Sequence, residues 1–227
     1  MPSDLAPELE ALDRRFVLAT VRVPVAGTDV ALETPRSADE LINEIDFARD
    51  ENLPYWADVW PSSIALAGVV AALDGRGRRA LELGCGLGLV TIGALRAGFD
   101  VLATDYYEDA LLFARRNGLR ATGREPRTRH VDWRAFPEDL GRFDLVLASD
   151  VLYEREYATL VADAIVAALA PGGIALVADP GRIALLSFVT ACEQRGCTVG
   201  IHARVPWTDG TAKQTITIHE VRSPVRA

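Results

Sequence analysis

The chain has 227 residues, of which 49% are hydrophobic, and this length suits one large domain with a sizeable core. Its formal net charge of −8 argues against a nucleic-acid partner, because phosphate backbones are bound through clustered Lys and Arg; the seven arginines of residues 115–134 are interpreted as a solvated face. No apolar stretch reaches the ~20 residues that span a bilayer, and the acidic start does not resemble a signal peptide. The three cysteines include no Cys-x-x-Cys pair, which fits a reducing compartment. We therefore expect a cytoplasmic protein with no membrane partner.

The first 58 residues are predicted to form an N-terminal extension that packs on the core. Ser37 and Glu40 have the spacing of a capping box, which marks the start of a helix. The elements expected in the extension are a helix at 7–15, strands at 16–25 and 30–33 around a turn at 26–29, and a helix at 38–49.

From Pro61 onward, helices and strands are predicted to alternate. Gly118 is the expected end of the third core helix, and Pro171-Gly172-Gly173 is the expected break after the fourth. Helices are expected at 61–73, 89–97, 108–117, 157–169 and 183–195, and strands at 79–83, 100–104, 127–131, 143–148, 174–178, 197–205 and 214–221.

This order of elements predicts the fold class. Strands separated by helices indicate βαβ units and a mostly parallel sheet, whereas the last two strands, joined by a loop alone, indicate an antiparallel edge hairpin. We therefore expect an α/β fold with a Rossmann-like, doubly wound, mostly parallel seven-stranded sheet.

A glycine loop follows the first core strand and opens a helix. Glu82, Gly84, Gly86 and Gly88 give the pattern E-x-G-x-G-x-G. A dinucleotide fingerprint would place its third glycine at Leu89, and no Gly-Lys-Ser/Thr follows. The loop therefore favours a nucleoside without a pyrophosphate, although such glycines alone can serve only close strand-to-helix packing.

Acidic residues end the next two strands. Asp105 stands where a carboxylate can accept hydrogen bonds from both ribose hydroxyls. Asp132 can accept from an adenine amino group while the indole of Trp133 covers the ring. Either acid alone could be a cap or turn residue. Together with the glycine loop, the three features indicate a nucleoside site at successive strand ends.

This loop resembles the first motif of the class I S-adenosylmethionine (SAM)-dependent methyltransferases. Over residues 54–180 the chain further resembles the seven-strand protein-lysine methyltransferases that modify chaperones, elongation factors and electron-transfer flavoprotein, whose bacterial relatives are called nicotinamide N-methyltransferase-like. The resemblance is carried by the tryptophans of segment 54–63, by Asp132-Trp133, and by the Asp-x-x-Tyr motif from Asp150 to Tyr153.

The resemblance implies a SAM-dependent methyltransferase domain at 59–227, with SAM as its cofactor. Asp150 and Tyr153 become the catalytic, substrate-facing pair. Residues before Pro54 match no family feature, so we expect substrate recognition there. The cofactor-binding candidates are Trp60, Glu82, Gly84, Cys85, Gly86, Gly88, Asp105, Asp132, Trp133 and Ser149.

The implied reaction is N-methylation of a protein lysine side chain. Asp150 would attract and orient the incoming ammonium. Tyr153 would hydrogen-bond the nitrogen or form one wall of the slot, with Trp60 and Trp207 as other walls that stabilise a cation. Alternatively, Asp150 caps a helix that begins near Glu154 and Tyr153 packs in the core.

Other functions compete with this one. A small-molecule N- or O-methyltransferase uses the same scaffold, a partner subunit without catalysis would have damaged motifs, and the glycine spacing disfavours a nicotinamide-dependent dehydrogenase. No Asn/Asp-Pro-Pro-aromatic tetrad follows the fourth strand, which argues against nucleic-acid bases as acceptors. No histidine stands beside an acid in a metal-ligand pattern, so we expect no metal.

Overall fold

The computed structural model describes residues 7–37, 54–208, 210–211 and 213–223. The expected helix at 38–49, with Glu40 of its capping box, lies outside the described residues. None of the helices in the described part of the chain is long and apolar enough to cross a membrane.

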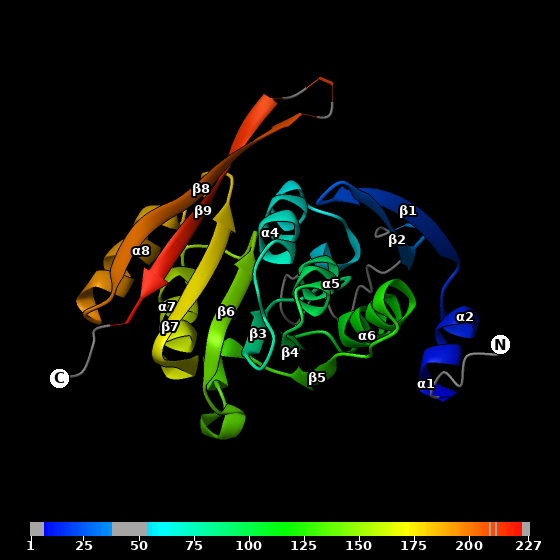
Figure 1. Cartoon of the computed structure of the whole chain (residues 1–227), viewed down its shortest axis with the longest axis horizontal. Helices are drawn as coiled ribbons and strands as arrows, with labels where there is room; N and C mark the ends of the chain where they lie inside the picture. The colour runs from blue at the N-terminus through cyan, green and yellow to red at the C-terminus, as the bar shows by residue number, and fades with distance from the viewer. Residues whose placement is uncertain (1–6, 38–53, 209, 212, 224–227) are drawn as a thin grey trace.

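A seven-stranded sheet forms the centre of the molecule (Figure 1). Its order is β5-β4-β3-β6-β7-β9-β8; neighbours from β5 to β7 run parallel, and β9 is antiparallel to both β7 and β8. The predicted fold class is therefore confirmed, including the edge hairpin. The strands are β3 Arg79–Leu83, β4 Asp100–Asp105, β5 Arg127–His130, β6 Phe143–Ser149, β7 Leu169–Asp179, β8 Thr198–Thr208 and β9 Lys213–Arg222.

Helices cover both faces of this sheet. Since side chains alternate along a strand, Leu145 and Leu147 of β6 join a cluster with α4 and α5, whereas Val146 and Ala148 join one with α7 and α8. Both faces of β6 are thus buried, as expected for a central parallel strand. The helices are α4 Pro61–Ala71, α5 Leu89–Arg96, α6 Glu108–Thr122, α7 Tyr157–Ala168 and α8 Leu185–Gln194.

The N-terminal extension begins with two short helices and a β-hairpin. α1 (Pro7–Glu10) and α2 (Leu12–Arg15) replace the single helix predicted at 7–15. β1 (Leu18–Val25) and β2 (Thr28–Pro35) pair antiparallel through a two-residue turn. Valine and leucine side chains on one face of the hairpin, Val23, Val25, Val30 and Leu32, are buried in the same cluster as α4 and α5. The hairpin thereby adds a second layer over the helices of that face.

Two predicted boundaries are wrong. α6 continues through Gly118 to Thr122, because a side chain at 118 would lie 2.7 Å from Cδ of Pro126 and the glycine allows this close packing inside the helix. The helix before Pro171–Gly173 does end, at Ala168, but the strand expected from 174 begins at Leu169 and includes Pro171–Gly173, and its register to β6 shifts between Phe143 and Leu145. In both places tertiary contacts override the local preference of Gly and Pro.

Candidate cofactor and acceptor site

A cavity of about 190 Å³ opens at the carboxyl ends of β3, β4, β5 and β6. The sheet order reverses between β3 and β6, and ligands of open α/β sheets bind at such a switch point. All predicted site residues except Glu82 and Gly88 line this cavity. The predicted residues that line the cavity are Trp60, Gly84, Cys85, Gly86, Asp105, Asp132, Trp133, Ser149, Asp150 and Tyr153.

The glycine loop connects β3 to α5 and needs its glycines for two different reasons. A side chain on Gly86 would lie 3.0 Å from the backbone oxygen of Trp56, so only glycine keeps this part of the floor open. A side chain on Gly88 would lie 2.7 Å from Cα of Ala114. Gly88 therefore serves the packing of α5 against α6, whereas Gly86 shapes the cavity.

Asp105 ends β4 at the bottom of the cavity. Its carboxylate accepts hydrogen bonds from the backbone N–H groups of Gly86 (2.9 Å) and Tyr107 (3.0 Å), and burial raises its pKa. These bonds fix the carboxylate toward the glycine loop. Each carboxylate oxygen accepts more than one hydrogen bond, so acceptor capacity remains for a diol such as ribose.

Glu82 lies behind the loop rather than in the cavity. It is buried in β3 and accepts a hydrogen bond from Oγ1 of Thr91, and burial raises its pKa to about 8. A carboxyl group with this pKa is mainly protonated at neutral pH. Glu82 therefore supports the loop from the core.

The far wall of the cavity is formed by residues 132–134. Asp132 accepts from the backbone N–H of Arg134 (2.9 Å) and from its Nε (3.0 Å), and the Arg134 guanidinium holds the pKa of Asp132 below its usual range. The ring of Trp133 lies over the glycine loop, because a side chain on Gly84 would contact its indole at 3.5 Å. The residues present thus fit an adenosine group: a carboxylate near its sugar, bare backbone beneath it and an indole beside it.

Asp150 directly follows β6 in an unusual local conformation. Its φ of 59° lies in the left-handed region, and the residue is buried. The carboxylate accepts hydrogen bonds from Oγ of Ser62 (3.0 Å) and Nε of Arg182 (2.6 Å). α7 begins only at Tyr157, after Glu156. The alternative in which Asp150 caps that helix is therefore wrong.

A row of aromatic rings lines the cavity beside Asp150. Adjacent ring centres lie 5.9 Å apart from Trp60 to Tyr55, 5.4 Å from Tyr55 to Tyr153, 5.1 Å from Tyr153 to Tyr157, and 5.6 Å from Tyr157 to Trp133. Burial raises the pKa of Tyr153, which keeps its hydroxyl protonated at neutral pH. Tyr153 thus faces the cavity instead of packing only in the core.

The structure corrects the expectation for Trp207 and shows where two of the histidines lie. Trp207 was expected as a further wall, but it lies on β8 and is not among the residues that line the cavity. His130 packs against Tyr106, and His219 lies on β9 with a buried Nε2. In the part of the chain that the structure describes, no three His, Cys, Asp or Glu residues are grouped as a metal site.

Four residues of the site were not predicted from the sequence. Ser62 and Arg182 hold Asp150, and Tyr55 and Tyr157 complete the aromatic row. Arg182 follows the end of β7, so the strand-end logic that found Asp105 and Asp132 would also have indicated residues 179–182. Tyr55 lies within the tryptophan-containing segment that was noted.

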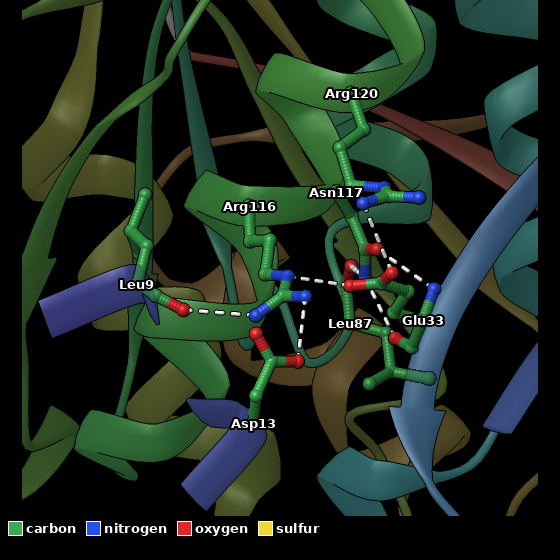
Figure 2. Close-up of polar contacts among 7 residues, drawn as sticks. All are labelled: Leu9, Asp13, Glu33, Leu87, Arg116, Asn117 and Arg120. Atoms are coloured by element: carbon green, nitrogen blue, oxygen red, sulfur yellow. Dashed lines mark hydrogen bonds and ion pairs between the residues drawn. The ribbon is translucent and has the colours of Figure 1, made fainter. Parts of the chain in front are cut away.

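Most of the predicted solvated arginine face is exposed, but Arg116 is buried. Figure 2 shows Arg116 of α6 donating to the backbone oxygen of Leu9 (2.9 Å) and pairing with Asp13 (2.9 Å) and Glu33. Arg120 pairs with the same Glu33 at 3.1 Å. These contacts attach the N-terminal extension to the core.

The neighbouring Asn117 links the extension to the glycine loop. Its Nδ2 donates to the backbone oxygens of Glu33 (2.9 Å) and Leu87 (3.0 Å), and its Oδ1 accepts from the N–H of Glu33 (2.8 Å) (Figure 2). In addition, Thr34 of β2 donates to the backbone oxygen of Ala57 (2.8 Å), in the 3-10 turn Tyr55–Ala57. The extension thus contacts both the loop and the segment that carries Tyr55.

The comparisons with known proteins agree with this geometry. Residues 81–175 match the family model described as "Methyltransferase domain". The N-methyltransferase NodS from Bradyrhizobium japonicum, solved in complex with S-adenosyl-L-homocysteine, has a similar structure, with a TM-score of 0.58 at 20% identity over 82% of this chain and 95% of that chain. The chain has a methyltransferase fold.

Two curated relatives match shorter regions. The electron transfer flavoprotein beta subunit lysine methyltransferase of Xenopus laevis is 30% identical over 137 residues, 57% of this chain and 53% of that protein. The ubiquinone biosynthesis O-methyltransferase of Bordetella avium is 33% identical over 104 residues, 43% of this chain and 41% of that protein. The matches thus span about half the length of these relatives or less. They confirm the predicted resemblance to SAM-dependent methyltransferases and, through the first relative, to protein-lysine methyltransferases.

Proposed function

We propose that this chain is a SAM-dependent methyltransferase that N-methylates the side-chain amine of a protein lysine. The observation that carries the proposal is the continuity of the cavity. A single cavity joins the glycine loop and Asp105 to Asp150 and the aromatic row. A nucleoside-bound methyl donor and an amine can therefore meet inside it.

On this proposal, one half of the cavity holds the cofactor, whose sulfonium supplies an activated methyl group. Gly84, Cys85 and Gly86 give the cofactor bare backbone to lie on, and Asp105 accepts hydrogen bonds from its ribose hydroxyls. The remaining contacts come from Asp132, Trp133, Ser149 and Trp60, while Glu82 and Gly88 hold the loop from behind.

The other half suits an amine. Asp150 orients the nitrogen through a hydrogen bond, and Tyr153 forms a wall of the slot. Aromatic faces stabilise a cationic nitrogen such as that of the methylammonium product, so this slot favours amines over neutral hydroxyl acceptors. Holding the nitrogen ~3–3.5 Å from the methyl carbon, in line with the bond that breaks, supplies much of the acceleration.

A small-molecule N- or O-methyltransferase is the second candidate. The observation that favours it is the similarity to the ubiquinone biosynthesis O-methyltransferase. We also keep as proposals the division into an extension at 1–58 and a methyltransferase domain at 59–227, a cytoplasmic location, and an acceptor that is neither nucleic acid nor membrane.

The test combines SAM titration with labelling. The wild-type protein should bind SAM, and labelled SAM added with a cell lysate should transfer label to a protein band. Asp105→Asn should lose SAM binding, whereas Tyr153→Phe should keep SAM binding and lose turnover. Asp139→Asn, which breaks the exposed pair with Arg129 outside the cavity, is the matched control and should behave as wild type.

The outcomes separate the candidates. Label in a small-molecule fraction would favour the second candidate over lysine methylation. A wild-type protein without measurable affinity for SAM or its demethylated product would contradict both.

A further inference from the structure

The carboxylate expected to receive the acceptor amine already has a cationic partner. Nε of Arg182 lies 2.6 Å from Oδ1 of Asp150, and Oγ of Ser62 lies 3.0 Å from Oδ2. The side chain of Asp150 is only 6% exposed, whereas that of Arg182 is 35% exposed. An incoming ammonium therefore meets a carboxylate whose charge is already compensated.

Arg182 is itself held in place from two sides. The loop that carries it is fixed by Asp179, whose Oδ1 accepts from the backbone N–H groups of Gly181 (2.6 Å) and Arg182 (2.8 Å). The guanidinium carbon lies 5.5 Å from the ring centre of Trp60, which lines the cavity. The guanidinium thus bridges the carboxylate and one aromatic wall.

The other ionisable groups around this pair do not replace the positive charge that Arg182 supplies to Asp150. Behind it, burial raises the pKa of Asp179 and lowers the pKa of His219, which weakens the charge of both. On the cofactor side, Arg134 is paired with Asp132. The remaining ionisable groups of the cavity lining are Asp58, Asp105, Tyr55, Tyr106, Tyr107, Tyr153, Glu154, Glu156, Tyr157 and Cys85.

A lone carboxylate would work against catalysis at this position. Methyl transfer needs the neutral amine, yet a carboxylate within ~4–6 Å favours the ammonium form. A guanidinium bound to that carboxylate cancels the effect, while the carboxylate oxygens keep lone pairs that accept from an amine N–H. The carboxylate can then orient the nitrogen without holding its extra proton.

We propose that Arg182 is a positioning residue that neutralises Asp150, so that the acceptor amine is bound in its uncharged, nucleophilic form. This inference rests on the proposed methyltransferase function. The ammonium gives its proton to solvent on entry, and the amine lone pair forms the bond to the methyl carbon. The carbon–sulfur bond breaks with its electron pair going to sulfur, and the methylammonium product later releases one proton to solvent.

The test is the pH dependence of kcat, because kcat reports ionisations in the enzyme–substrate complex. The acceptor protein that the labelling experiment identifies is purified and held, with SAM, at saturating concentration. Arg182→Met should raise the midpoint of the rising limb by about one pH unit, which lowers the rate about tenfold below the midpoint. Arg182→Lys, which keeps the charge, should stay near the wild-type midpoint.

Two further variants make the result decisive. Asp150→Asn leaves the charge of Arg182 uncompensated, so the midpoint of its residual activity should move to lower pH. The Asp150→Asn measurement also tests the inference if Arg182→Met does not fold. Arg195→Met removes another Arg–Asp pair from α8, with Asp163 outside the cavity, and should leave the pH profile and SAM affinity unchanged.

Failure of the inference is distinct from failure of the proposed function. If Arg182→Met lowers the rate equally at every pH, or both charge variants keep the wild-type midpoint, Arg182 is only a structural clamp and the inference is overturned. If the wild-type protein binds no SAM and labels no acceptor, the proposed function fails first and the inference falls with it.

Discussion

Arg116 and Arg182 are both paired with carboxylates, yet their surroundings differ. Arg116 is 5% exposed and is held by Leu9, Asp13 and Glu33, which attach three segments of the extension to α6. Arg182 is 35% exposed, has one carboxylate partner and lies over an aromatic ring at the cavity. Because only Arg182 can exchange partners without unfolding its surroundings, we expect Arg116 to govern stability and Arg182 to govern catalysis.

Replacing Arg116 tests the structural side of this comparison and should have the largest effect. Arg116→Met removes a buried guanidinium, leaves Glu33 with Arg120 as its cationic partner and leaves Asp13 and the Leu9 carbonyl without this donor. Breaking a buried ion pair costs about 3–5 kcal/mol of unfolding free energy. For a protein of this size we expect Tm to fall by about 10 °C in calorimetry.

The control is Arg127→Met, which removes an exposed pair with Asp100. Its expected loss is below about 1 kcal/mol. Equal Tm shifts for the two variants would show that the network of Figure 2 has no special role in stability.

Glu82 extends the comparison to a buried carboxyl group that accepts a hydrogen bond from the hydroxyl of Thr91. Its folded pKa of about 8, against an ordinary 4.5, means that the folded protein keeps a proton that the unfolded chain releases between these values. The stability of the wild type should therefore fall as pH rises from 4.5 to about 8, by at most about 1.4 kcal/mol per pH unit.

Glu82→Gln removes this titration while it keeps a hydrogen-bonding side chain. Denaturant unfolding at pH 5 and pH 8 should show the variant gaining on the wild type at the higher pH. Parallel pH dependence in the two proteins would contradict the buried, proton-holding state of Glu82.

Asn117 lies between the two regions, since it contacts both the extension and the glycine loop. Asn117→Ala should cost about 1–3 kcal/mol, because three backbone groups lose a partner. The release of Leu87 should also weaken SAM binding by several-fold in titration calorimetry.

Thr122→Ala on the same helix is the control for Asn117. It removes a hydrogen bond to Gly118, far along α6 from the loop contact, and should leave SAM affinity unchanged. Equal SAM affinity in the Asn117 and Thr122 variants would mean that the extension does not influence the cofactor loop.

Arg182→Met should have the smallest effect on stability. Asp150 is buried, but removal of Arg182 opens a side that is already 35% exposed, and the hydrogen bond from Ser62 remains. We therefore expect a loss of about 1–2 kcal/mol, which lowers Tm by less than about 8 °C. A loss as large as that of Arg116→Met would remove the contrast between the two arginines.

Local patterns were sufficient to predict the fold and to bring together at one cavity most of the residues proposed for the cofactor. β3 has the predicted bounds because the run Arg-Ala-Leu-Glu-Leu ends at a glycine loop, and Asp105 and Asp132 line one cavity because parallel strands end at one edge. The end of α6 was missed because Gly118 packs against Pro126, a contact that the helical pattern does not encode.

The acceptor half of the site was harder to predict. Asp150 is held by Ser62 and Arg182, which lie 88 and 32 residues away along the chain. Such partners become neighbours only when α4 and the loop after β7 meet at the carboxyl ends of the parallel strands. The expectation for Trp207 is wrong for a related reason. The sequence predicts a hairpin at one edge of the sheet, but it does not indicate that β8 is the outer strand of that hairpin, farthest from the cofactor strands.

The left-handed backbone of Asp150 restricts which amino acids this position accepts over evolutionary time. Asp, Asn and Gly adopt this conformation readily, whereas other residues add about 1–2 kcal/mol. Of these three, only Asp also carries an anion. A library of all amino acids at position 150 should therefore yield folded protein with a few residue types and active protein with fewer still. The backbone conformation thus limits which substitutions this position accepts even before their effect on catalysis is considered.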